Sequence, residues 1–376
     1  MNKSSYSAII LGDSTNNTLS IVRSLGEANI EQTLILKCEE DICFVSKSKY
    51  LKNSHVYQIS TIEDCMPILE QFKKKSDKQQ TIICSFDEAA VFIDDKEPVL
   101  APFFRTPTRG KQIGILFNKD EQCKLADKCG LTVPRSLTFH RADDIDKFII
   151  SYPILLKPLN SIKGKKSDIH ICKNKKEVES ALKEESTCFD FVLQEFIDKE
   201  YEIDCVGVRT EKEMCLAGGV RKIRHYPPGI GAGAFGLFKP IENYSVNLQG
   251  VERFLKQVNY YGPFSVEFLH RDNKDYFMEV NFRNEGLAYA ATAAGANLHA
   301  LYLNPNMSID RKKIHEIYLM NYSLDFLYVK HGNLSLWTWL RDLLRTRCFI
   351  NVNWKDLKPT ICYYKNKIRS KFTVNK

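Results

Sequence analysis

The stretch DYFMEVNFRN, residues 275–284, places residue types that bind metals and phosphates on one face of a predicted β-strand. Apolar and polar side chains alternate in the order Met278, Glu279, Val280, Asn281, Phe282 and Arg283. This period of two puts the apolar side chains on one face and the polar ones on the other. An ordinary half-buried strand does not need a carboxylate, an amide and a guanidinium in succession, so we treat this face as a candidate for chemistry.

A second predicted strand, GPFSVEFLH (262–270), comes just before this one, and together they suggest a β-hairpin. We expect a three-residue loop of Asp272, Asn273 and Lys274. The resulting cross-strand pairs are Glu267 with Glu279, Ser265 with Asn281, and Leu269 with Phe277. The alternative is a register shifted by one residue, in which the glutamates are solvated or paired with Lys256 or Lys274.

Two carboxylates directly opposite each other destabilise a sheet unless a cation compensates for them. Oxygen ligands such as Glu267, Glu279 and Asn281 suit Mg²⁺, which commonly lies beside substrate phosphates. Arg283 on the same face could hold a phosphate or a carboxylate through two parallel hydrogen bonds. The hairpin therefore predicts a magnesium site, with solvated glutamates as the alternative of equal weight.

Lys157 ends the apolar strand YPILLK (152–157), where burying an ammonium group without a partner is costly. The polar, basic loop that follows, residues 159–168, contains Ser161 and Gly164 and could cover phosphates, although it is not a P-loop. A solvated hairpin tip is the commoner reason for such a loop. The lysine and the loop together indicate an anion-binding element only if other features support them.

Two further stretches have residue types that suit a nucleotide or another anion. The strand FVLQEFI (191–197) ends with Gln194 and Glu195, where backbone groups could bind an adenine, and Glu202 nearby could bind a ribose. In the stretch 218–236, basic residues come directly before a glycine-rich loop, a combination that suits an anionic substrate. These side chains and glycines are Arg221, Lys222, Arg224, His225, Gly229, Gly231, Gly233 and Gly236. Solvated glutamates and a surface loop are the alternatives.

The order of predicted elements indicates an α/β unit followed by an α+β unit. Residues 6–37 read as strand, loop, helix and strand, which is typical of a doubly wound sheet, and 81–89 read as a later strand of it. The stretch that starts at Phe117 predicts a helix that ends at Gly130. From residue 152 onward, strands dominate, first in a small β–loop–β–α–β unit and then in an antiparallel set.

Composition and charge narrow the function classes. The chain has 376 residues, of which 44% are hydrophobic and 27% charged, as in globular proteins. The segment from Arg341 to Lys376 holds ten basic and two acidic residues, so its net charge of +8 equals that of the whole chain. A neutral body argues against nucleic-acid binding. The start of the chain lacks a signal-peptide pattern, and the twelve cysteines show no CxxC spacing, so we expect free thiols and a cytoplasmic location.

Taken in order, these motifs resemble those of the ATP-grasp superfamily. The motifs are Lys119, the lysine strand YPILLKP, a loop, LQEFI with a downstream glutamate, SVEF, and the pattern E-x-N-x-R in MEVNFR. The resemblance covers roughly residues 1–310 and is closest to the biotin carboxylase and carbamoyl-phosphate synthetase type and to D-aspartate-ligase-like carboxylate–amine ligases. The loop after Lys157 has one glycine, and we find neither a biotin-carrier segment nor a second grasp module, so a stand-alone ligase fits best.

The resemblance implies a role for each matching residue. Lys119 and Lys157 would contact ATP phosphates, and the loop containing Ser161 and Gly164 would cover them. The adenine and ribose would contact Gln194, Glu195, Ile197 and Glu202. Two Mg²⁺ ions would be held by Glu267, Glu279 and Asn281. Arg283, with Lys157, would act in catalysis by holding the phosphate or the substrate carboxylate.

The resemblance also implies a division into four parts. We expect an N-terminal doubly wound α/β (pre-ATP-grasp) domain over residues 1–115. The two α+β subdomains of the ATP-grasp fold would follow, a small lid subdomain over 116–198 and a large subdomain over 199–310. Residues 311–376 would form a C-terminal helical basic extension. The loop GDSTNN (12–17) of the first domain is a candidate for helping to build the substrate site.

The implied activity is ATP-dependent joining of a carboxylate to an amine through an acyl phosphate, with release of ADP and phosphate (the EC 6.3 class). The alternative is an ATP-binding regulatory or scaffold protein that makes no product. Small-molecule carboxylates and amines are the expected partners, and a homodimer is left open.

The basic tail allows two interpretations. Residues 334–350 place Trp337, Leu340 and Leu344 at helical spacing with arginines beside them, which is compatible with peripheral contact with an anionic membrane. The simpler interpretation, which we favour from sequence, is a helix packed on the grasp domain with a solvated basic face.

Overall fold

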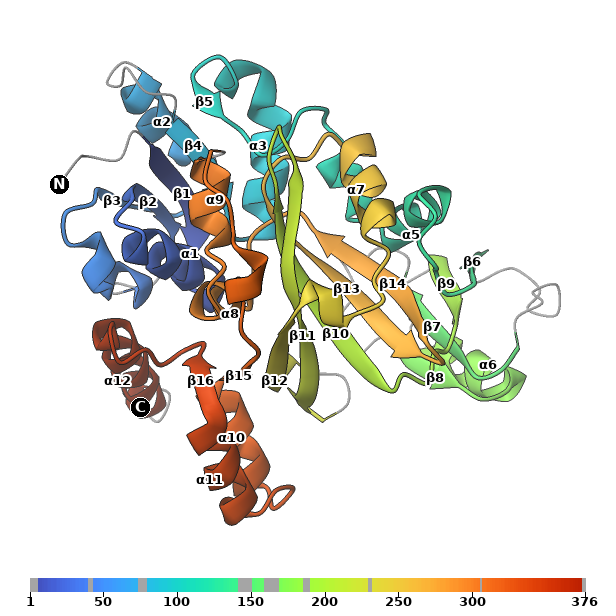
Figure 1. Cartoon of the computed structure of the whole chain (residues 1–376). Helices are drawn as coiled ribbons and strands as arrows, with labels where there is room; N and C mark the ends of the chain where they lie inside the picture. Colours follow the sequence, from blue (N-terminus) through green and yellow to red (C-terminus); the bar gives the residue numbers. More distant parts are fainter. Residues whose placement is uncertain are drawn as a thin grey trace.

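A computed structural model of the chain describes residues 6–39, 43–73, 80–140, 151–158, 169–184, 190–228, 232–304 and 306–373. Within these ranges the strands form three sheets, which Figure 1 shows with the first sheet on the left and the smallest one on the right. The three sheets follow one another along the chain. The predicted loop 159–168, with Ser161 and Gly164, lies outside the described residues.

The first sheet is parallel, and its strand order is β3-β2-β1-β4-β5. Its strands are β1 (Ser7–Asp13), β2 (Glu31–Lys37), β3 (Val56–Ile59), β4 (Gln80–Cys84) and β5 (Phe104–Arg105). The centres of β1 and β2 are continuous buried runs, as expected for strands covered on both faces. This is the doubly wound unit that the sequence predicted.

Helices cover both faces of this sheet. α1 (Asn16–Glu27) packs on the face that contains Ile10 and Leu34, while α2 (Cys65–Lys73) and α3 (Asp87–Leu100) pack on the face that contains Ile9 and Ile35. The strand order reverses between β1 and β4, so the loops after these two strands diverge and leave a crevice at the carboxyl edge. Ligands commonly bind at such a switch point.

The smallest sheet is antiparallel and has the order β6-β9-β7-β8. Its elements are β6 (Ser136–His140), β7 (Ile154–Pro158), β8 (His170–Cys172), α6 (Lys175–Glu184) and β9 (Asp190–Glu195). Its core of Ile154, Leu156, Val178, Phe191 and neighbours is separate from the two larger cores. A unit with its own small core can move as a body relative to the others.

The largest sheet has the order β14-β13-β10-β11-β12-β15-β16 and is antiparallel except for its last pair. Its strands are β10 (Tyr201–Arg209), β11 (Met214–Tyr226), β12 (Ala232–Pro240), β13 (Pro263–Arg271), β14 (Lys274–Asn281), β15 (Ile317–Met320) and β16 (Thr346–Phe349). Helix α7 (Leu248–Gln257) covers one face of β13 and β14, where the ring centroids of Phe254 and Phe277 lie 5.6 Å apart. Phe268 of β13 pairs with Phe277 on this covered side, so its neighbour Glu267 faces the other way.

Short helices connect the sheets. α4 (Ile113–Leu116) and α5 (Lys119–Lys128) lead into the smallest sheet, and α8 (Ala288–Ala293) and α9 (Leu298–Leu303) follow β14. The predicted helix end is confirmed: α5 stops at Lys128, and Gly130 has a left-handed φ of +78°. No helix among the described residues combines the length and apolar character that a membrane crossing requires.

The segment after residue 310, predicted as a helical basic extension, also contributes two strands. β15 and β16 add to the edge of the largest sheet. The helices α10 (Tyr322–Lys330) and α11 (Leu336–Arg345) lie between these strands in the chain, and α12 (Leu357–Thr373) follows β16. These strands are four residues each, too short for sequence periodicity to distinguish them. The division of the chain into four parts stays a prediction.

Two arginines, Arg23 which is buried and Arg224 which is partly buried, fasten this segment to the rest of the chain. Arg224 of β11 donates hydrogen bonds to Asp325 of α10 and to Asp342 of α11. Arg23 of α1 donates to Asp356 at 3.2 Å, and both side chains are almost fully buried. The hydroxyl of Ser48 also donates to Asp356. Each buried carboxylate thus has a cationic partner, as burial requires.

Replacing Arg23 by methionine should destabilise the protein by about 3–5 kcal/mol, because Asp356 would be left buried without its cation. Urea denaturation followed by circular dichroism measures the loss. The matched control is Arg311→Met, which removes an exposed pair with Glu242 and should leave the unfolding midpoint nearly unchanged. Equal shifts for the two variants would contradict the structural role given to Arg23.

Candidate active site

Three carboxylates lie in one row across three neighbouring strands of the largest sheet. Glu279 of β14 is opposite Glu267 of β13, and Glu267 is opposite Asp204 of β10. The predicted pairing of Glu267 with Glu279 is confirmed, as is that of Ser265 with Asn281. The row lies on the face opposite α7, where Glu279 and Glu267 are partly exposed and Asp204 is buried.

The predicted hairpin loop is wrong by one residue. The loop contains only Asp272 and Asn273, whose φ angles of 49° and 57° are left-handed, as the tightest hairpin turn requires. A bulge between Glu267 and Phe268 takes up the extra residue, so Leu269 faces Tyr276 and not Phe277. The bulge lies beside the carboxylate row and keeps the two glutamates opposite each other.

Lysines compensate for the row of carboxylates in this structure. Lys119 lies 2.6 Å from Glu279, and Lys222 lies 3.0 Å from Glu267 and 3.9 Å from Asp204. Burial alone would raise the pKa of Glu279, but Lys119 outweighs it, and the pKa is below its usual value. Burial prevails at Glu267, where the pKa is raised despite Lys222. The row is an acidic surface that requires cations in contact with it.

A fourth carboxylate, Glu285, extends the acidic surface beyond the end of β14. Single ligand atoms of Asp204, Glu267 and Glu285 all lie within 4.8 Å of one another. Burial and then Glu285 raise the pKa of Asp204 well above its ordinary value, and its Oδ1 atom has no hydrogen-bond partner among the described residues. Sequence reasoning missed both acids, although Asp204 is two residues after Glu202 and Glu285 is two after Arg283.

Arg283 connects the acidic surface to the first domain. Its guanidinium donates to Asp87 of α3 at 2.8 Å, to Glu285 at 3.1 Å and to the side-chain oxygen of Asn281 at 3.1 Å. The amide of Asn281 also donates to Ser265. Glu267, Glu279 and Asn281 offer only oxygen ligands, and two of them already face ammonium groups. This donor set fits Mg²⁺, the ion that the sequence predicted.

The two predicted phosphate-binding lysines lie close enough to influence each other. Lys157 of β7 donates to Gln194 of β9 at 2.9 Å. Burial, and then the charge of Lys119, lower the pKa of Lys157 to about 8. Gln122 of α5 accepts from the backbone N–H of Val280 at 2.7 Å and fixes the start of this helix, with Lys119, beside β14. The two lysines are thus brought together from helix α5 and strand β7.

The residues predicted to bind the adenine and the ribose lie at the end of β9, in the connection after it and at the start of β10. Gln194 and Ile197 are buried, and Glu195 accepts a hydrogen bond from the backbone N–H of Arg135. Glu202 faces Lys199, Lys222 and His225. Burial would raise the pKa of Glu202, but the hydrogen bond from His225 and the two lysines lower it. Glu202 is therefore a carboxylate held for hydrogen bonding.

The basic stretch before the glycine-rich loop does not act as one anion site. Arg221 stacks on the ring of Tyr201, and Arg224 forms ion pairs with Asp325 and Asp342. Only Lys222 reaches the carboxylate row. Gly229 and Gly231 lie outside the described residues, and Gly233 and Gly236 are part of β12.

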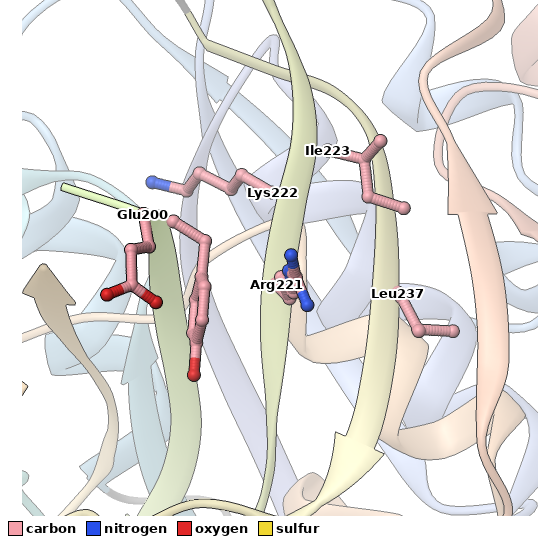
Figure 2. Close-up of a pocket in the computed structure, with 6 residues that line it drawn as sticks. Glu200, Arg221, Lys222, Ile223 and Leu237 are labelled. Atoms are coloured by element: carbon pink, nitrogen blue, oxygen red, sulfur yellow. The ribbon is translucent and has the colours of Figure 1, made fainter. Parts of the chain in front are cut away.

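A hollow of about 320 Å³ beside β10–β12 lies away from the predicted site. Its lining residues are Glu200, Tyr201, Arg221, Lys222, Ile223 and Leu237. Figure 2 shows Arg221 and Leu237 of neighbouring strands bordering it. Lys222 is its one link to the carboxylate row, and none of the residues predicted to hold nucleotide or metal lines it. The hollow therefore does not define the candidate active site.

The first domain borders the acidic surface at its switch point. Asn17, in the first turn of α1, accepts from the backbone N–H of Gly286 at 2.8 Å, and Asn284 donates to the backbone oxygen of Asn17. The backbone N–H of Asn284 also donates to the oxygen of Cys84, at the end of β4. The switch point of the first sheet thus lies against the segment 284–286, which directly follows Arg283.

No protein-family model matches the chain. The carbamoyl phosphate synthase large chain of Saccharolobus islandicus (strain L.S.2.15 / Lassen #1) is 25% identical over 202 residues. The match covers 51% of this chain but only 19% of that relative, so the chain spans about a fifth of the length of the curated protein it matches.

Solved structures of ligases share the fold over most of the chain. N5-carboxyaminoimidazole synthetase from Staphylococcus aureus complexed with ADP has a TM-score of 0.65 and 16% identity, covering 89% of this chain and 87% of that one. The L-amino acid ligase from Bacillus licheniformis has a TM-score of 0.63 and 15% identity, covering 85% and 80%. The predicted resemblance to the ATP-grasp superfamily and the predicted fold class are confirmed.

The depressed pKa of Lys157 can be measured directly. An NMR titration of ¹³C-methylated lysines should give a midpoint near 8 for Lys157 in the nucleotide-free protein. Replacing Lys119 by methionine should raise that midpoint, because a neighbouring positive charge disfavours the protonated form. A wild-type midpoint at the ordinary lysine value would show that the two ammonium groups are not close together.

Proposed function

From the ATP-grasp fold of the chain, we propose that it is an ATP-dependent carboxylate–amine ligase. The observation that carries the proposal is the row of Glu279 and Glu267 facing Lys119 and Lys222, with Lys157 close to Lys119. An acidic surface with buried lysines around it suits a nucleotide that arrives with magnesium. A fold alone would leave the function open, so these side chains are the argument.

The nucleotide would lie between the smallest and the largest sheet. Lys119 and Lys157 would contact its phosphates, with Ser161 and Gly164 of the loop 159–168 closing over them. Gln194, Glu195 and Ile197 would border the adenine, and Glu202 would bond the ribose. The Staphylococcus aureus synthetase with the same fold is complexed with ADP, which supports a nucleotide site in this fold.

Glu267, Glu279 and Asn281 would hold two Mg²⁺ ions with the nucleotide. When bound, the ions supply positive charge that neutralises the phosphates and the charge developing during transfer. The contacts of Lys119 with Glu279 and of Lys222 with Glu267 indicate where positive charge is favoured in this site. Lys119 would then turn from Glu279 to a phosphate oxygen, a movement its half-exposed side chain allows.

The reaction would proceed in two transfers. An oxygen of the substrate carboxylate attacks the γ-phosphorus of ATP, and the bond between the γ-phosphorus and the bridging oxygen of the β-phosphate breaks. ADP departs, and an acyl phosphate is formed. The amine nitrogen then attacks the acyl carbon, loses a proton, and inorganic phosphate departs with the C–O bond electrons. Arg283 and Lys157 would act by positioning and by electrostatic stabilisation of the transferring oxygens.

The first domain would complete the substrate site. Asn17 from the predicted loop 12–17 and Cys84 at the end of β4 contact the segment 284–286 at the switch point, directly after Arg283. A substrate carboxylate bound there would accept two parallel hydrogen bonds from the guanidinium of Arg283. The L-amino acid ligase that shares the fold is consistent with small carboxylates and amines as the substrate classes.

A screen for ADP release tests the proposal. Purified protein with MgATP should release ADP only when both a carboxylate and an amine are present, and Glu279→Gln should lower turnover by at least about 100-fold without changing the circular dichroism spectrum. The matched control is Glu252→Gln, which alters an exposed pair with Lys256 and should keep full activity. Binding of MgATP without turnover in any substrate pair would favour the alternative, a regulatory or scaffold protein.

The affinity for MgATP should fall as the pH rises above 8. Lys157 binds phosphate only when protonated, and its pKa in the free protein is about 8, so binding at higher pH must take up a proton. Calorimetry in buffers of different ionisation enthalpy should detect that uptake near pH 9 and lose it in Lys157→Met. A constant affinity between pH 7 and pH 9.5 would remove Lys157 from the nucleotide site.

A further inference from the structure

Helix α11 exposes apolar side chains that its packing does not explain. Trp337 and Leu344, seven residues apart, are 82% and 83% exposed, and Leu340 lies between them on the same face. The opposite face is the packed one: Trp339 is buried against the rings of Tyr322 and Phe326 of α10. The helix is packed and its basic side chains are exposed, as the interpretation favoured from sequence expects, but Trp337 and Leu344 take no part in that packing.

Helix α12 and the residues before it repeat the pattern. Trp354 is 77% exposed, and Leu357, Ile361 and Ile368 are exposed at spacings of four and seven residues, so they share one face. The other face of α12 packs through Cys362 and Tyr363 against the core beneath it. In Figure 1 both helices lie on the lower left rim of the molecule.

The charge around these faces has one sign. The segment from Arg341 to Lys376 holds only two acids, Asp342 and Asp356. Both are buried, each against an arginine from outside the segment, Arg224 and Arg23. The exposed charges are basic: Arg341, Arg345, Arg347, Lys355, Lys358, Lys365, Lys367 and Arg369. These eight basic side chains lie in the same segment as the exposed apolar side chains.

We propose that α11 and α12 form a surface that binds an anionic lipid bilayer without crossing it. Exposed tryptophan and leucine side chains would enter the boundary between headgroups and acyl chains, and the basic residues would bind the anionic headgroups. A second copy of this chain fits this surface less well than a lipid bilayer does. A symmetric contact would bring each arginine against the arginines of its partner, and like charges oppose such a contact.

The three tryptophans of the chain provide a direct test, since all of them, Trp337, Trp339 and Trp354, lie in this segment. The full-length protein is mixed with vesicles of phosphatidylcholine alone or with about one third phosphatidylserine. The protein should co-sediment with the anionic vesicles. Its tryptophan fluorescence should then shift to shorter wavelength and be quenched less by acrylamide. Added salt should weaken the binding. No binding to anionic vesicles would overturn the proposal.

Paired variants separate the apolar from the electrostatic contribution. The double change Trp337→Ser and Leu344→Ser should abolish sedimentation with anionic vesicles, and each of Arg341→Gln and Arg347→Gln should weaken it about fivefold. The matched control, Phe103→Ser with Ile115→Ser, removes exposed apolar side chains elsewhere and should bind normally. Equal binding by all variants, or a dimer in analytical ultracentrifugation that the Trp337/Leu344 variant dissolves, would contradict a lipid partner.

Discussion

Three carboxylates placed side by side on adjacent strands repel one another, and the rest of the site is arranged to offset that repulsion. Glu279, Glu267 and Asp204 occupy one row of the largest sheet, where like charges at cross-strand distance are unfavourable. Lys119 and Lys222 lie against the row. A sheet that had only to be stable would not concentrate acids in this way, which is why we propose a cation that enters with a ligand.

The helices and the smallest sheet are placed so that one face of the largest sheet is covered by apolar packing and lysines lie against the row on the other face. Helix α7 covers the opposite face through Phe254 and Phe277, which supplies the apolar burial and keeps the polar face open. Helix α5 is held to β14 by Gln122, so Lys119 reaches the row from outside the sheet. The smallest sheet brings Lys157 and has its own core, which allows it to close over a ligand as a unit.

Much of this arrangement was predictable from local patterns, and the rest depends on contacts between distant segments. Strand periodicity placed Glu267 opposite Glu279 because both lie in one hairpin. Asp204 joins them only because β10 pairs with β13, and no local pattern specifies that pairing. The hairpin loop was misjudged because the extra residue is absorbed in a bulge and not in the turn. The exposed face of α11 could not be read from sequence, since helical spacing does not say which of two apolar faces is buried.

The most direct measurement is a crystal structure of the protein with a non-hydrolysable ATP analogue and Mn²⁺, using the anomalous signal of the metal. The account predicts an anomalous peak about 2.1 Å from carboxylate oxygens of both Glu267 and Glu279, with Lys157 against a phosphate. A nucleotide bound in the hollow beside Arg221, or a metal peak that touches neither glutamate, would contradict it.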